Sequence, residues 1–431
     1  MNNIGLLIKM ARIQQNMKQV TLAKGICSTS YLSKIENNQT VPSEDVIKLL
    51  IDRLGIDYWS ISLEEENQFM NELLNFYKKS IIERNKNNIN EEIPKLFNKN
   101  LLFKNEKNFY TYNLILYRLI LILNPNDERC LALQNTLKHM EDKFDGRQKF
   151  LYYFNSGIYN YIQRNFDEAL SFFESALSLI STFQIDEWEL ADFYNAISLS
   201  YLTEGKITHT IEYASQSLAL FRNNLLFRRA FDSYIIVGIA HKKNSNFKLA
   251  EESFLLAQKI VNDLNLKDQN GMILQNLGSL AAIQGDSVKA IQYFEESLLN
   301  FDTDTDIDYY LVTVLSIIME FSKYTNSEKV IEWCIRGLSI IQKNSSTMTD
   351  PFYHHFNVYL ALHENNEFED MLISALNFFE NTQDYIHAHK YCILLGNKFA
   401  ENRKYKNATL YLQRANSYLY IIKTIKHWED L

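Results

Sequence analysis

The chain has 431 residues and a formal net charge of −8, with only 4 prolines and 12 glycines. So few helix breakers at this length favour long helices in more than one domain. No uncharged apolar run reaches the roughly 18 residues that a bilayer span needs, and no signal peptide is present, so we expect a cytoplasmic protein without a membrane partner. The four cysteines lack CxxC or His-containing metal spacing, which favours reduced core thiols and excludes a metal centre.

The N-terminal segment predicts a small helical domain. Apolar residues at three-to-four spacing, Leu7, Ile8 and Ala11, give a first helix a core face, and Leu22 with Ala23 do so for a second. We expect Gly25 to end the second helix, Ile26 to point inward and Ser28 to cap a third helix that runs from about 28 to 37.

The third helix has one apolar face and one polar face. Leu32 and Ile35 are expected in the core, which leaves Thr29, Ser30, Ser33 and Lys34 facing outward. The spacing is that of a helix-turn-helix, whose recognition helix places its N-terminal residues against base edges. A fourth helix is expected to start at Pro42 and Ser43 and to end at Gly55, with apolar residues Val46, Leu49, Leu50 and Leu54.

Residues 4 to 60 resemble the phage-repressor-like (Cro/C1, or XRE) helix-turn-helix domains. The resemblance implies base contacts by Thr29, Ser30 and Lys34, and phosphate contacts by Gln19, Tyr31 and Asn37. Arg12 and Glu36 match the ion pair that ties the first helix to the third in that family. The turn before the third helix is one residue shorter than in the phage repressors.

Charge favours DNA as the partner of this segment alone. Residues 1 to 58 carry seven basic and five acidic side chains, so the remainder of the −8 chain carries −10. Phosphate neutralisation provides most of the affinity for nucleic acid, and only the N-terminal segment has a suitable sign. Since one such domain would bind weakly, we expect a homodimer or higher oligomer on a two-part site in double-stranded DNA, spaced by about one helical turn or a multiple of it.

The remainder of the chain contains internal repeats. Small and aromatic residues recur at offsets of 12, 16 and 19 in three segments, which are Gly157, Ala169, Phe173, Ala176; Gly238, Ala250, Phe254, Ala257; and Gly278, Ala290, Phe294, Ser297. These offsets resemble the tetratricopeptide (TPR) repeat, in which small residues let two helices pack closely. Weaker copies give about seven repeats with a period near 40 residues.

The predicted fold class is therefore all-α, a repressor-like helix-turn-helix domain followed by a right-handed TPR superhelix. We assign residues 1–62 to DNA binding, 63–146 to a linker helix and divergent helical hairpins, and 147–431 to a TPR domain for peptide binding and oligomerisation. The motif Asn124-Pro125-Asn126-Asp127 predicts a repeat junction inside the linker region.

In the TPR pattern, the first helix of each repeat lines a concave wall that can hold an extended peptide, because side-chain amides pair with both backbone N–H and C=O. Counting from the small residue of each repeat predicts groove residues, of which we select Tyr161, Asn195, Gln275 and His363. Three asparagines one residue further along are included as well, namely Asn155, Asn276 and Asn357.

The whole arrangement resembles the RRNPP family of peptide-pheromone receptors, named for Rgg, Rap, NprR, PlcR and PrgX, and it is most similar to the NprR/PlcR branch. This resemblance implies a transcriptional regulator that is switched by a short signalling peptide in quorum sensing. The alternative is a Rap-like module that sequesters or dephosphorylates a response regulator through residues 66 to 145. An enzyme of conventional type is not expected, because no phosphate loop, HExxH, GxSxG or catalytic set is present, and no cofactor is implied.

Overall fold

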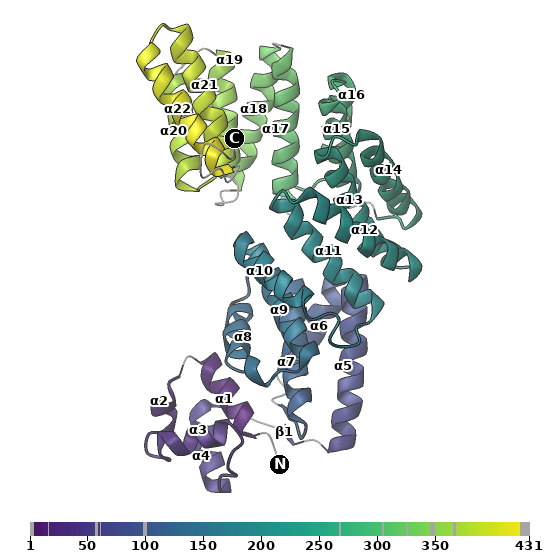
Figure 1. The fold of residues 1–431 in the computed structure, drawn as a ribbon, viewed down its shortest axis with the longest axis vertical. Coiled ribbons are helices and arrows are strands. Elements are labelled where there is room, and N and C mark those ends of the chain that lie inside the picture. The colour runs from purple at the N-terminus through teal and green to yellow at the C-terminus, as the bar shows by residue number, and fades with distance from the viewer. Residues whose placement is uncertain are drawn as a thin grey trace. The chain divides into compact units, whose positions relative to one another are not determined.

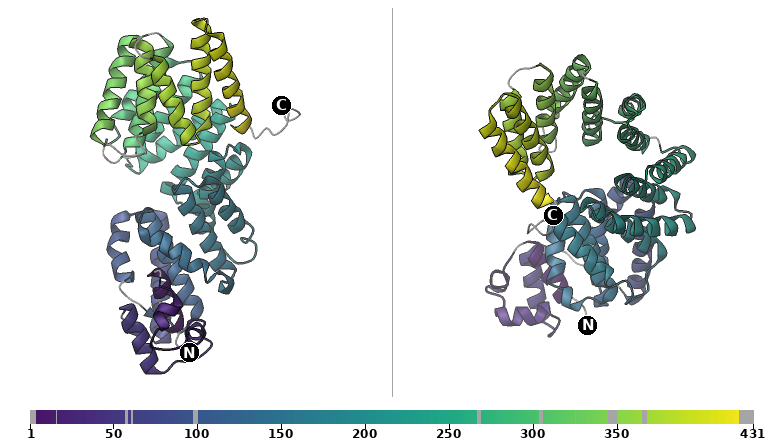
Figure 2. Two further views of the ribbon diagram at one scale, coloured as in Figure 1. Left: turned by 90° about the vertical axis from the view of Figure 1, so that its left-hand side faces the viewer. Right: turned by 45° about the horizontal axis from the view of Figure 1, so that its top comes forward.

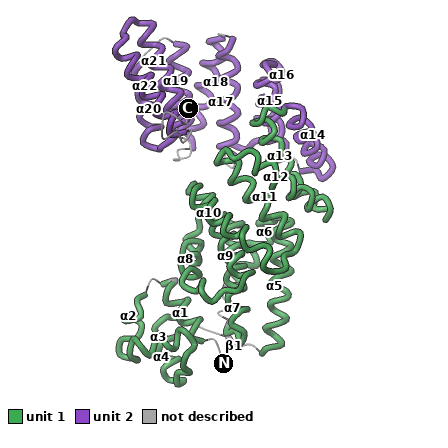
Figure 3. The backbone as a smooth tube through the Cα atoms, viewed as in Figure 1, with its two compact units in different colours: residues 1–246 green, residues 247–431 purple. Residues whose placement is uncertain are grey.

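The computed structural model describes most of the chain in two compact units, Met1–Asn246 and Phe247–Leu431, which are considered separately (Figure 3). The described residues are 4–15, 17–56, 59–60, 62–97, 101–266, 269–303, 306–324, 326–344, 350–364 and 368–422. They form helices apart from two short strands, which confirms the all-α fold class (Figure 1). In this part of the chain, no helix combines the length and apolarity needed to cross a bilayer.

The first four helices are α1 (Ile4–Gln14), α2 (Gln19–Ala23), α3 (Thr29–Glu36) and α4 (Glu44–Leu54). Gly25 and Gly55 follow α2 and α4 with φ of 75° and 63°, values that favour glycine and stop a helix. The predicted turn positions are therefore confirmed. Of the apolar residues of α4, Leu49 is 50 % exposed, while Ile51 at 6 % exposure packs into the core.

A helical connector follows the first four helices. Its elements are α5 (Leu63–Glu83), α6 (Lys86–Phe97), α7 (Glu106–Leu123), α8 (Glu128–Lys138) and a short 3-10 helix at Glu141–Lys143. The strands β1 (Trp59–Ser60) and β2 (Leu101–Leu102) pair in parallel, with Trp59 opposite Leu101, a pairing that the sequence did not predict. α7 ends where the Asn124 to Asp127 junction was expected.

The repeat region contains helices of mostly 12 to 18 residues that alternate with short turns. Their bounds are α9 (Gly146–Ile162), α10 (Phe166–Leu177), α11 (Glu187–Thr203), α12 (Ile207–Asn223), α13 (Phe227–Lys243), α14 (Phe247–Asp263), α15 (Asn270–Ile283), α16 (Ser287–Leu298), α17 (Ile307–Lys323), α18 (Ser327–Lys343), α19 (Asp350–Glu364), α20 (Phe368–Asn381), α21 (Tyr385–Glu401) and α22 (Tyr405–Ile422). Consecutive pairs match the predicted repeats. Figure 2 shows the helices of the C-terminal unit stacked in chain order.

Within a repeat, the glycine of the first helix lies directly on the large side chain 16 residues later. A Cβ at Gly157 would lie 2.7 Å from the ring of Phe173, and one at Gly278 would lie 2.6 Å from Phe294. In the last repeat, a Cβ at Gly396 would lie 2.7 Å from Leu412. The offsets found in the sequence therefore correspond to close contact between paired helices.

Replacing Gly157 by alanine is expected to destabilise the N-terminal unit by about 1–3 kcal/mol, because the added methyl group overpacks the contact with Phe173. Thermal unfolding of the variant measures the loss. A second substitution, Phe173→Leu, removes part of the ring, so the double variant should lose less stability than the two single losses added together. Simple additivity would show that the Gly157 contact is not the cause.

Candidate functional site

The recognition helix α3 is built as the sequence predicts. The Ser28 hydroxyl accepts a hydrogen bond from the N–H of Tyr31 at 3.1 Å and so caps the helix. Leu32 and Ile35 are buried at 0 % and 1 % exposure. Thr29, Ser30 and Lys34 are exposed on the opposite face, and Tyr31, Ser33 and Asn37 are partly exposed beside them. The Asn37 amide donates to the Ser33 carbonyl at 2.9 Å.

An ion pair fixes α3 against α1. The Arg12 guanidinium donates to both carboxylate oxygens of Glu36, with Nε to Oε1 at 2.5 Å and Nη2 to Oε2 at 2.8 Å. Gln19 adds a third donor, its Nε2 lying 2.7 Å from Oε2 of the same carboxylate, which is fully buried. The Arg12–Glu36 pair is thus confirmed. Gln19, predicted as a phosphate contact, has a structural bond that the sequence did not reveal.

Helix α1 has two apolar faces that belong to different cores. Leu7, Ile8 and Ala11 pack inside the helix-turn-helix domain, as predicted. Leu6 and Met10, at 0 % and 4 % exposure, pack instead with the connector, in a core that includes residues of α8. The DNA-binding domain therefore docks on the connector through α1, and the outer face of α3 stays open.

Four of the predicted peptide-groove residues remain partly exposed, although most have partners. The Tyr161 hydroxyl on α9 lies 3.0 Å from the Thr203 hydroxyl on α11, so this contact joins the first repeat to the second. His363 lies between two hydroxyls, with Nε2 3.1 Å from Ser322 and Nδ1 3.0 Å from Ser327. The other two are Gln275 and Asn357, and the Asn357 amide donates to the carbonyl four residues before it.

The other three predicted groove residues are corrections, because they are buried. Asn155 is 0 % exposed and donates to the Leu114 carbonyl of α7 at 2.9 Å. Asn195 is 7 % exposed and donates to the Ser233 hydroxyl at 3.0 Å. Asn276 is 6 % exposed and donates within its own helix. These amides satisfy polar groups between packed helices, where a lost hydrogen bond is costly.

Comparisons with known proteins agree with a helix-turn-helix domain followed by helical repeats. A helix-turn-helix family model, HTH_3, matches residues 8–58. The transcriptional activator NprA of Geobacillus stearothermophilus is 28% identical over 408 residues, which cover 92% of this chain and 98% of NprA. Response regulator aspartate phosphatase E of Bacillus subtilis is 23% identical over 313 residues, or 69% of this chain and 81% of that protein.

The structure of NprR in complex with its cognate peptide NprX has the same fold. It aligns with a TM-score of 0.62 and 16% identity, covering 82% of this chain and 99% of NprR. The chain resembles the RRNPP family. Since NprA matches along nearly its whole length, the RRNPP resemblance includes both the helix-turn-helix and the repeats.

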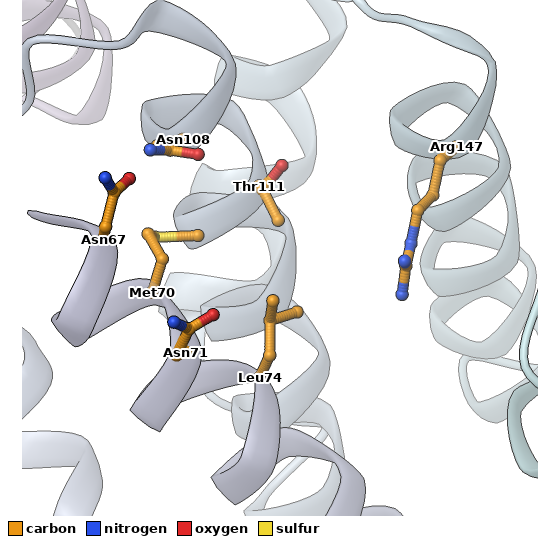
Figure 4. Close-up of a pocket in the computed structure, with 7 residues that line it drawn as sticks. All are labelled: Asn67, Met70, Asn71, Leu74, Asn108, Thr111 and Arg147. Carbon is orange, nitrogen blue, oxygen red and sulfur yellow. The ribbon is translucent and has the colours of Figure 1, made fainter.

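The connector contains a cavity of about 410 Å³ between α5, α7 and α9 (Figure 4). Residues of α5 line one side at the spacing of a helical stripe, and Arg147 of α9 lies opposite. Its guanidinium is 3.2 Å from the buried carboxylate of Glu189. The full lining is Asn67, Met70, Asn71, Leu74, Asn108, Thr111 and Arg147. Side-chain amides therefore dominate the polar lining of a cavity that sequence reasoning missed.

A buried ion cluster joins the connector to the first repeats. Asp192 of α11 is 2 % exposed, and each of its oxygens is 2.5 Å from a guanidinium, that of Arg118 or that of Arg229. Arg84, at the end of α5, lies 3.7 Å from the same carboxylate. Burial alone would raise the pKa of Asp192, but the three guanidinium groups outweigh burial and hold that pKa below its ordinary value.

Three of the four cysteines are core thiols as expected, whereas Cys27 is a correction, because its side chain is partly exposed. All four are free, and Cys130, Cys334 and Cys392 are fully buried. Burial raises the pKa of Cys130 and of Cys334 to about 12, which keeps both protonated and unreactive at neutral pH. Over the described ranges, no group of three His, Cys, Asp or Glu side chains is placed to hold a metal ion.

Proposed function

We propose that this RRNPP protein is a cytoplasmic transcriptional regulator that binds a two-part DNA site as a homodimer or higher oligomer and is switched by a short signalling peptide. The observation that supports the proposal best is the combination, in one chain, of an open recognition helix with an array of TPR-like helix pairs. NprA is named as a transcriptional activator, and NprR is described with a bound cognate peptide.

The proposed DNA contacts are the exposed polar residues of α3, with Thr29, Ser30 and Lys34 at base edges and Ser33 beside them. Gln19, Tyr31 and Asn37 are proposed at phosphates. Because only a few phosphates are neutralised per domain, affinity should depend on two domains bound together and should fall steeply with salt.

Lys34→Ala is expected to weaken binding by about tenfold on an operator selected from random duplexes, because a lost base contact costs about 1–3 kcal/mol. Gel shifts at several salt concentrations measure the change. Lys48→Ala on α4 is the matched control, since it removes the same charge from an exposed position of the same domain, and it should change affinity less than threefold, about 0.6 kcal/mol. Equal losses in the two variants would refute the assignment of α3 as the reading helix.

Peptide control is proposed to act through the repeats, with Tyr161, Gln275, Asn357 and His363 as the remaining candidates for contacts. A ligand can shift an oligomer or domain equilibrium only by its differential affinity for the two forms. The test is a gel shift with and without a short peptide selected for binding to the full chain from a synthetic peptide library, carried out on the full chain and on residues 1–146. A truncated fragment that responded to peptide as the full chain does would contradict the proposal.

A second candidate is control of a response regulator through the connector. The amide-lined cavity of about 410 Å³ lies in this region, and a relative is named as a response regulator aspartate phosphatase. Binding of purified phosphorylated response regulators, followed by loss of the aspartyl phosphate, tests it. If every regulator that binds keeps its phosphate, the protein sequesters response regulators and does not dephosphorylate them.

A further inference from the structure

A larger groove lies in the N-terminal unit and shares no lining residue with the cavity of Figure 4. It has a volume of about 640 Å³ and runs between α8 and α10, with α9 at its base. The α8 side is a stripe at positions i, i+3, i+4 and i+7, which are Leu131, Gln134, Asn135 and Lys138. This spacing places all four side chains on one helix face.

The bonds around the groove identify its two ends. At one end, Gln163, which follows the last residue of α9, donates to Asn126 at 3.2 Å, and Asn126 lies just before α8. Glu168 lies in the first turn of α10. At the other end, the ring of Tyr152 lies 6.5 Å from that of Phe172, and Lys138 is the last residue of α8. The groove therefore has a carboxylate at one end and an ammonium group at the other.

The polar groups of the groove are available to a ligand. In the described ranges, Gln134, Asn135, Lys138 and Glu168 all line the groove and have no hydrogen bond or ion pair with the protein. The α8 stripe from 131 to 138 spans about 10 Å at 1.5 Å per residue. Three to four residues of extended peptide, at about 3.3 Å each, cover that length.

We propose that this groove binds a short peptide with free termini, its ammonium group at Glu168, its carboxylate at Lys138 and its backbone on the amides of Gln134 and Asn135. Opposite charges at the two ends match the opposite charges of a free peptide, and side-chain amides match its backbone. The site is distinct from the first-helix positions of the repeats, so it can exist whether or not those positions hold a signalling peptide.

The groove is placed to influence DNA binding, because α8 is shared. Its other face, with Cys130, Leu133 and Leu137, belongs to the same core as Leu6 and Met10 of α1. A peptide that holds α8 toward α10 therefore acts on the surface where the helix-turn-helix domain docks. Peptide binding and docking are coupled to the extent that the peptide has different affinities for the docked and the undocked helix-turn-helix domain.

The test is hydrogen–deuterium exchange of the full chain with tetra-alanine, using one form with free termini and one that is N-acetylated and C-amidated. The free form is expected to slow exchange in 128–138, 166–177 and 4–14, and the capped form to have little effect. Glu168→Gln and Lys138→Gln should each raise the half-saturating concentration by about fivefold. Glu128→Gln, on α8 but absent from the groove lining, is the matched control and should leave the concentration unchanged.

Equal protection by the capped peptide, or no protection by the free peptide at saturating concentration, would overturn the proposal. So would protection that persists unchanged in both charge variants. The proposed DNA-binding function is tested independently of this groove, because the gel shifts with Lys34→Ala contain no tetra-alanine.

Discussion

Replacing Asp192 by asparagine is expected to destabilise the N-terminal unit by about 3–5 kcal/mol, because it leaves two buried guanidinium groups without their carboxylate. Arg118 and Arg229 are 4 % and 1 % exposed, and the Nε of each already lacks a partner within the described structure. Burial lowers the pKa of Arg229 to about 10, which shows how strongly this site disfavours unpaired charge. Hydrogen–deuterium exchange in α7, α11 and α13 measures the loss for this unit alone.

Two further variants isolate the cause. Asp232→Asn removes another carboxylate of the cluster, 2.6 Å from Arg229, but its side chain is 30% exposed, so we expect a loss of only about 1 kcal/mol. Replacing Arg118, Asp192 and Arg229 together by Met, Leu and Met removes both guanidinium groups along with the carboxylate between them. This triple variant should recover most of the stability that Asp192→Asn loses. If Asp192→Asn and Asp232→Asn behaved alike, the unpaired-charge argument would fail.

The pKa of Asp192 also sets a pH limit for this cluster. Because that pKa is lower in the folded protein than in the unfolded chain, the carboxylate stabilises the fold at neutral pH, and its contribution is lost as pH falls below its ordinary value of about 3.9. The cluster should therefore stay intact throughout the physiological range.

The sequence predicts the features that depend on neighbouring residues. Gly25 and Ser28 act through their own backbone and the next turn, so the bounds of α3 follow from local rules. The repeats are also local, because Gly157 and Phe173 lie on adjacent helices of one hairpin. Both predictions were confirmed without knowledge of any distant contact.

Features that depend on distant residues were missed. The two guanidinium partners of Asp192 lie 74 and 37 residues away, and nothing in their spacing indicates a shared site. Asn155 was predicted in the groove, yet its partner is a carbonyl of α7, 41 residues earlier. The stripe from 131 to 138 is visible in the sequence only as three polar residues, Gln134, Asn135 and Lys138, on one face of a short helix.

Lowering the pH from 7.5 to 5 is expected to destabilise the C-terminal unit by about 2 kcal/mol through His355. This imidazole lies on α19 at 3 % exposure, and its Nδ1 forms a hydrogen bond with the Tyr391 hydroxyl. Burial lowers the pKa of His355 to about 3, and the nearby His387 and Lys390 act in the same direction. Asp384, which lies 2.7 Å from the His387 ring, opposes them only weakly.

The sign follows from proton binding. Between pH 6.5 and 3 the unfolded chain binds a proton at His355 that the folded protein does not, so acid favours unfolding, and the stabilisation is complete only above about pH 6.5. Denaturant unfolding at both pH values, with hydrogen exchange in α19 and α21 to assign the unit, measures the difference. His355→Phe keeps a ring against Phe379, whose centroid is 5.0 Å away, and should remove most of the pH dependence.

His139→Gln, at an exposed position after α8, serves as the control and should retain the full pH dependence. A His355→Phe variant that still lost about 2 kcal/mol at pH 5 would assign the acid sensitivity to other groups. Because the proposed peptide contact His363 lies on the same helix, eight residues after His355, loss of order in α19 at acid pH should also weaken peptide binding. Peptide affinity measured at pH 7.5 and 5 in the His355→Phe variant then separates loss of helix order from titration of His363 itself.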